Sequence, residues 1–73
     1  MLEPDNVREI VCKYIKEQKN ATDISVTTIE KKDNIWIVHG TCPIDLEGHP
    51  WMESFRVEVD RKGRVQTSRW RLL

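Results

Sequence analysis

Apolar and polar residues alternate with two different periods along the chain, and the period changes near residue 20. Over residues 4–19 the apolar positions recur at spacings of three and four, which is the pattern of one helix face. These positions are Val7, Ile10, Val11, Tyr14 and Ile15. Pro4 suits the first helical turn, and Asn20 suits a left-handed residue at the end. The pattern predicts one amphipathic helix over residues 4–19.

After residue 20, β-branched and aromatic residues dominate, and alternating segments predict four strands. The predicted strands are residues 24–31, 34–42, 51–60 and 64–72. Ile29 is out of phase with Ile24 and Val26, which indicates a β-bulge or a strand apolar on both faces. Residues 43–50, with a proline at each end and a glycine inside, predict the longest loop.

Two short segments predict tight turns. Lys32-Asp33-Asn34 has residues that tolerate left-handed conformations, and Asp60-Arg61-Lys62-Gly63 is typical of a type I turn. With Gly63 left-handed, Val59 lies opposite Val65.

An amphipathic helix and an amphipathic sheet must cover each other, because neither can bury its apolar side alone. The predicted fold class is α+β, with one N-terminal helix packed on a four-stranded antiparallel β-meander, in a single domain of residues 1–73. A chain of 73 residues buries only about 60–65% of its unfolded surface. Its stability is therefore marginal unless a disulfide, a metal or a second subunit supplements the core.

The stretch from Asn34 to Cys42 is apolar on both faces, which suits the centre of a sheet. We expect Trp36, Val38 and Gly40 to face the helix, together with apolar residues of the last two strands, Phe55, Val57, Val59 and Val65. Gly40 is expected to let the helix approach closely.

The opposite face then holds Ile35, Ile37 and His39. The register predicted for the last hairpin sets Phe55 opposite Arg69 and Ser54 opposite Trp70. The expected outer interface, for self-association or for another protein, is Ile35, Ile37, His39, Met52, Trp70 and Leu72. The alternative is that the last strand is shifted by one residue, so that Trp70 lies under the helix.

The formal net charge is zero, but its distribution is uneven. Residues 61–73 carry five bases and no acid, so this segment has a formal charge of +5, whereas residues 1–60 have a formal charge of −5. A nucleic-acid-binding module is therefore the second alternative, through Arg61, Lys62, Arg64, Arg69 and Arg71. Zero net charge and the lack of an RNA-binding sequence box weigh against it.

The residues suited to metals or nucleophilic catalysis are few: Cys12, His39, Cys42 and His49. Their spacing matches no zinc pattern, and the only thiol–base candidates pair Cys42 with His39 or His49. A Cys12–Cys42 disulfide stays open as an alternative. We expect a protein that is not an enzyme, with no catalytic residue, no metal and no cofactor.

The N-terminus is acidic and enters the predicted helix directly, so no signal peptide is expected. No apolar run approaches the roughly 18 residues of a membrane span. Two cysteines are too few for a disulfide scaffold, which favours a cytoplasmic protein with reduced thiols and no membrane partner.

The order helix, Trp36-x-Val38-x-Gly40, loop, and Phe55-x-Val57-x-Val59-Asp60-x-x-Gly63-x-Val65 resembles the small helix-plus-meander domains of cystatin-like and PepSY-like type. With the ending Arg69-Trp70-Arg71, it is also distantly similar to the gas-vesicle synthesis protein O family. That resemblance covers about residues 5–71 and implies an accessory role in assembly without catalysis. The chain departs from that family at Trp70 and Leu72, where a basic, tyrosine-containing tail is usual.

Overall fold

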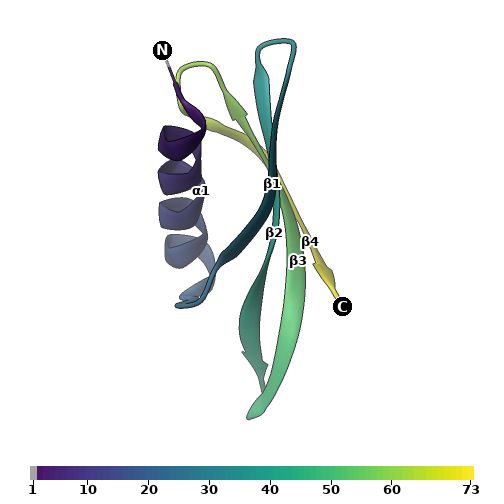
Figure 1. Cartoon of the computed structure of the whole chain (residues 1–73). Helices are drawn as coiled ribbons and strands as arrows, with labels where there is room; N and C mark the ends of the chain where they lie inside the picture. Colours follow the sequence, from purple (N-terminus) through teal and green to yellow (C-terminus); the bar gives the residue numbers. More distant parts are fainter. Residues whose placement is uncertain (1) are drawn as a thin grey trace.

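The computed structural model describes residues 2–73 of the chain. One helix, α1 (Pro4–Lys19), precedes four strands, β1 (Ser25–Lys32), β2 (Ile35–Leu46), β3 (His49–Asp60) and β4 (Val65–Leu72). The strands form one antiparallel sheet in the order β1-β2-β3-β4, and α1 lies along one face of it (Figure 1). The predicted α+β class and meander order are confirmed.

The apolar stripe of α1 packs on the sheet as predicted. Val7, Val11 and Ile15 are fully buried, and the Tyr14 hydroxyl lies 3.0 Å from Ser68 Oγ on β4. Asn20 ends the helix with a left-handed φ of 55°. On the sheet side, the buried core consists of alternate residues of β2 and β3: Trp36, Val38, Cys42, Phe55, Val57 and Val59. The core therefore lies between α1 and the two central strands.

Gly40 serves a different purpose from the one predicted. A methyl group at this position would overlap the Ser25 carbonyl oxygen of β1 and the Phe55 ring of β3. The close approach at Gly40 is therefore made by the neighbouring strand and by an aromatic ring, rather than by the helix. A glycine covered by a cross-strand aromatic side chain is a recurring arrangement in sheets.

The irregularity predicted in the first strand is a β-bulge. The pairing of β1 with β2 shifts between Val26 and Thr28. Because of this shift, Val26 and Ile29 both pack against the core although they are an odd number of positions, three, apart in the sequence.

Residues 43–50 are not the predicted loop. β2 and β3 continue in unbroken register to the pair Leu46 and His49, and only Glu47 and Gly48 form the turn, with φ values of 52° and 84°. Two central residues with positive φ give the two-residue turn that matches strand twist. Pro43 and Pro50 lie where β1 and β4 have ended, and a proline is tolerated at such a free edge.

The extended hairpin makes the molecule long, at 41 × 18 × 17 Å. β1 pairs with β2 only as far as Thr41, and β4 pairs with β3 only as far as Glu53. We call residues 43–51 the overhang, because this two-stranded ribbon projects past the end of α1 and past both neighbouring strands (Figure 1).

The register of β4 differs from the prediction after Val65. Val59 does pair with Val65, but Gln66 is an extra residue, so that Glu58 pairs with Thr67. Trp70 is consequently opposite Phe55, with ring centroids 5.9 Å apart, and the Lys19 ammonium lies 4.5 Å from the Trp70 ring. The outer-face positions predicted for Trp70 and Leu72 are wrong, and the alternative of a one-residue shift is correct. The gain is the burial of Trp70 against Phe55 and Lys19.

The contacts of Gly40 predict the cost of enlarging it. Gly40→Ala must displace the Phe55 ring or the β1 backbone, so we expect a loss of about 1–3 kcal/mol in the free energy of unfolding. Urea denaturation followed by tryptophan fluorescence measures this loss. Thr67→Ala, at an exposed strand position, is the control and is expected to change stability by less than about 0.5 kcal/mol. Equal stability of Gly40→Ala and the wild type would contradict the close packing of Ser25 and Phe55 on Gly40.

Candidate functional site

The outer face of the sheet, away from α1, keeps four of the six residues predicted for it. Ile35, Ile37 and His39 on β2 lie there half-buried, and Met52 on β3 lies there with 44% of its surface exposed. Their β3 neighbours on this face are charged, and Arg56 Nη1 lies 2.7 Å from Glu58 Oε2. Without Trp70 and Leu72, this face is a narrow apolar line along β2 between charged strands.

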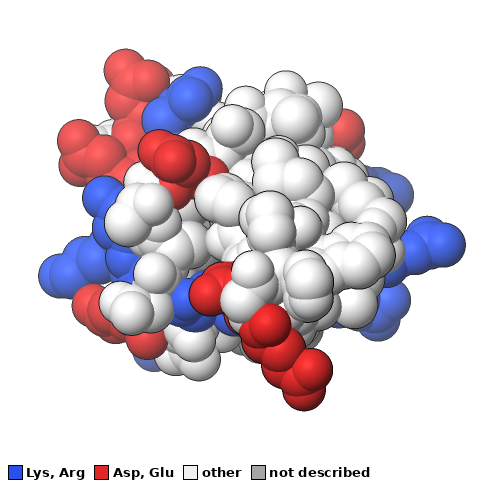
Figure 2. All heavy atoms as spheres, turned by 90° about the horizontal axis from the view of Figure 1, so that it is seen from below, with Lys and Arg blue, Asp and Glu red and all other residues white. Residues whose placement is uncertain are grey.

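The exposed apolar side chains gather instead at the end of the molecule that carries the overhang. Leu46, Trp51, Met52, Leu72 and Leu73 are 40–65% exposed, and Ile44 links them to the core. We call these six residues the apolar end. Figure 2 looks at the molecule from this side and shows a broad central area without charge, with Lys, Arg, Asp and Glu at its margin.

Strand alternation explains why this surface is uncovered. Ile44, Leu46 and Trp51 continue the helix-facing side of β2 and β3, on which Trp36 and Val57 are buried. However, α1 ends at Lys19 and does not reach them. Prediction from sequence missed this surface because it treated residues 43–50 as a loop; the alternation of Ile44 and Leu46 was the available signal.

A hollow of about 790 Å³ lies between the end of α1 and the overhang, lined by Lys19, Asn20, Ala21, Ile44, Leu46 and Glu53 among others. Glu53 is only 8% exposed, and its Oε1 makes no hydrogen bond within residues 2–73. The Lys19 ammonium lies 3.4 Å from that oxygen and also over the Trp70 ring. Glu53 thus pairs with Lys19, and Leu72 is its cross-strand neighbour on β4.

The five basic residues proposed for a polyanion lie at the two ends of β4. Arg61, Lys62 and Arg64 belong to the β3–β4 turn, whereas Arg69 and Arg71 lie on the outer face near the C-terminal end. The structure therefore does not bring them into one patch.

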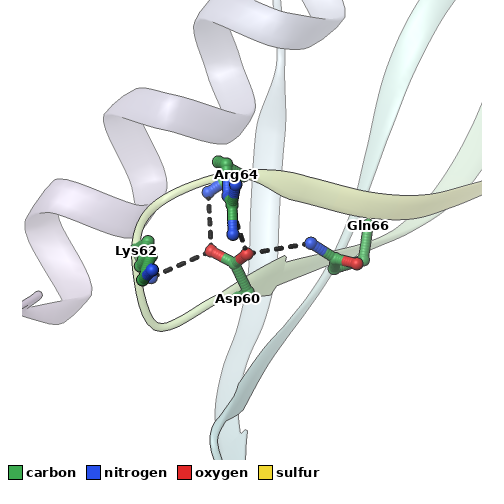
Figure 3. A network of polar contacts seen from close by, with 4 residues as sticks. All are labelled: Asp60, Lys62, Arg64 and Gln66. Atoms are coloured by element: carbon green, nitrogen blue, oxygen red, sulfur yellow. Dashed lines mark hydrogen bonds and ion pairs between the residues drawn. The ribbon is translucent and has the colours of Figure 1, made fainter.

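Asp60 accepts hydrogen bonds from the β3–β4 turn and forms an ion pair with Arg64 (Figure 3). Its Oδ1 accepts hydrogen bonds of 2.9 Å from the backbone N–H groups of Lys62 and Arg64. Its Oδ2 accepts them from Arg64 Nε at 3.1 Å and from Gln66 Nε2 at 2.9 Å. The backbone N–H of Arg64, followed by that of Lys62 and the Arg64 guanidinium, lowers the pKa of Asp60 although desolvation opposes this.

The thiols and carboxylates offer little chemistry. Cys12 and Cys42 are free, and Cys42 is fully buried. Burial raises the pKa of the Cys42 thiol, the Glu53 charge raises it further, and Lys19 partly opposes them. A buried thiol with a raised pKa is a poor nucleophile. No group of three or more His, Cys, Asp or Glu residues in residues 2–73 is arranged to hold a metal ion.

The described part of the chain has no helix with the length and apolar character of a membrane span. Comparison of the chain with protein-family models, curated proteins and solved structures gives no match. The resemblance to cystatin-like and PepSY-like domains and to the gas-vesicle synthesis protein O family stays a prediction.

The burial of Cys42 predicts unequal thiol reactivity. In the native protein a thiol reagent is expected to modify half-buried Cys12 first, whereas Cys42 reacts only when the structure opens, at least about 100-fold more slowly. Stopped-flow labelling of Cys12→Ala and Cys42→Ala isolates each thiol. Comparable rates for the two variants would contradict the packing of Cys42.

The hydrogen bonds of Asp60 predict a pH dependence. Its pKa in the folded protein lies below the ordinary value of 3.8, so the carboxylate stabilises the fold above that value. This contribution is lost as pH falls through the lowered folded pKa. Asp60→Asn is expected to be less stable at neutral pH and to lose less stability between pH 5 and about pH 2.

Chemical denaturation across that pH range measures the difference. Lys62→Ala is the matched control, because Asp60 accepts from the backbone of residue 62 and not from its side chain. If Asp60→Asn and the wild type lost the same stability as the pH falls, the hydrogen bonds of the Asp60 carboxylate would not contribute to the stability of the fold.

Proposed function

We propose that the protein is a non-catalytic binding and assembly module that associates with a second copy of itself through the apolar end. The observation that carries this proposal is the continuation of the sheet's apolar side past the end of α1, at Ile44, Leu46 and Trp51. The proposal moves the interface from the outer face of the sheet, where it was predicted, to the overhang.

The size of the apolar end supports an interface. Its exposed large side chains present on the order of 500 Å² of apolar surface in total, with Leu46, Trp51 and Leu72 on the helix-facing side of the sheet and Met52 on the outer face. A stable interface buries roughly 800 Å² on each partner, with an apolar centre and a polar rim. The uncharged centre and charged margin in Figure 2 follow this pattern.

Two properties favour a second copy as the occupant. First, a chain of 73 residues has a small core, and covering Ile44, Leu46 and Trp51 would extend that core directly. Second, the formal net charge is zero, so two copies approach without net repulsion. A twofold arrangement would place one overhang against the other and complete both cores.

The second alternative, nucleic-acid binding through the last hairpin, has weaker support. Its basic side chains are divided between the ends of β4, and Arg64 is paired with Asp60. Trp70, the aromatic residue between Arg69 and Arg71 in the sequence, packs against Phe55 and Lys19 on the helix side of the sheet. We also propose a cytoplasmic location, where the free thiols of Cys12 and Cys42 stay reduced.

Solution mass tests the proposal. Sedimentation across a concentration series is expected to show the wild type moving from 8.7 kDa towards twice that mass. Trp51→Ser removes the largest exposed side chain of the apolar end and is expected to weaken dimerisation at least about tenfold.

Ile37→Thr is the control, since it makes an apolar-to-polar change on the outer face of the sheet. It is expected to dimerise like the wild type. A wild type that stays at 8.7 kDa at millimolar concentration would overturn the proposal. Loss of dimerisation in Ile37→Thr but not in Trp51→Ser would return the interface to the outer face. Circular dichroism confirms that each variant is folded.

A further inference from the structure

The outer face of the sheet carries an unusual block of hydrogen-bond donors. Strand pairing places Thr28, His39, Arg56 and Arg69 in one row across all four strands. The adjacent row consists of Ser25, Thr41, Ser54 and Arg71. These eight side chains include three guanidinium groups and no carboxylate.

The positive charges in this block are poorly compensated. Arg56 and Arg69 are directly opposite each other on β3 and β4, an arrangement that repels when nothing lies between the charges. Glu58, in the next row, pairs with Arg56 at 2.7 Å. Within residues 2–73, neither Arg69 nor Arg71 forms an ion pair. Within the described residues, the exposed Arg69 and Arg71 thus have no carboxylate partner, whereas Arg56 already shares its charge with Glu58.

The block also lines a concavity. A hollow of about 710 Å³ on this part of the sheet is bordered by His39, Thr41, Ser54, Arg56, Arg69 and Arg71 among others. That volume lies in the usual range for small-molecule sites. The walls are held in place, because Thr28 Oγ1 lies 3.2 Å from His39 Nδ1 and Ser54 Oγ donates to the Arg71 carbonyl oxygen at 3.3 Å.

We propose that this hollow is a binding site for the phosphate group of a small molecule, with Arg56, Arg69 and Arg71 as its principal ligands. Guanidinium groups match phosphate oxygens in pairs. Neighbouring strands are about 4.8 Å apart and alternate residues about 7 Å apart, so the three arginines bracket an area of phosphate or diphosphate size. A phosphate group also has more acceptor oxygens than a carboxylate, as three guanidiniums require.

The arginines of the site lie apart from the centre of the proposed dimer interface. They lie on the outer face, whereas Leu46 and Trp51 of the apolar end lie on the opposite side of the sheet. Leu73 of the apolar end also borders the hollow. Bound phosphate would relieve the repulsion between Arg56 and Arg69 and would therefore stabilise the folded protein.

Titration with inorganic pyrophosphate at constant ionic strength tests the site, with NMR amide shifts and the melting temperature as readouts. The wild type is expected to bind, with shifts centred on His39, Arg56, Arg69 and Arg71, and to gain in melting temperature over chloride. Arg69→Gln is expected to raise the dissociation constant about tenfold or more. Without ligand, this variant is expected to be as stable as the wild type or more stable, because it removes a like-charge pair.

Arg61→Gln is the matched control, since it removes one charge from the turn at the other end of β4. It is expected to change the dissociation constant by less than about twofold. Equal losses of pyrophosphate affinity in Arg61→Gln and Arg69→Gln would show that binding depends only on overall charge, and would overturn the site. An absence of binding at millimolar pyrophosphate would also overturn it. An affinity for oligothymidylate that exceeds that for pyrophosphate and increases with oligomer length would overturn the small-molecule assignment in favour of nucleic acid. Repeating the titration with Trp51→Ser separates the site from dimerisation.

Discussion

The helix is shorter than the sheet it covers, and the rest of the structure depends on this mismatch. A 16-residue helix is about 24 Å long, whereas a 12-residue strand is about 40 Å long. α1 therefore covers only part of β2 and β3. Where it does, Val7, Val11 and Ile15 make a dry core with Val38 and Val57. Past the end of α1 at Lys19, the same faces of β2 and β3 continue with apolar residues that the helix does not cover.

The helix, the four strands and their order could be predicted from the sequence because each depends on local periodicity and short turns. The errors lie where one residue decides between two arrangements. A single extra residue at Gln66 turned Trp70 from the outer face to the helix side. Two residues with positive φ, Glu47 and Gly48, allowed strands to continue through a segment whose prolines predicted a loop. Both choices depend on tertiary contacts, which periodicity does not report.

The candidate surfaces were less predictable than the fold for the same reason. Predicting the apolar end requires knowing how far α1 reaches, and predicting the block of donors on the outer face requires the pairing of all four strands. Arg64 and Arg69 also differ in their charged neighbours, which the sequence alone does not show. Arg64 is held by a carboxylate four residues away, whereas Arg69 faces another arginine. Two arginines only five positions apart in the sequence thus have opposite electrostatic surroundings.

The two prolines of the overhang limit how copies of this chain can associate. The overhang has two free edges, and adding strands there repeatedly would lead towards a fibre. Pro43 and Pro50 each remove one backbone donor from the ribbon, so strand addition at the overhang would lose hydrogen bonds. Contact through the apolar faces avoids that loss and, in a twofold pair, uses up both surfaces at once. The prolines thus fit the proposed twofold dimer better than open-ended strand addition.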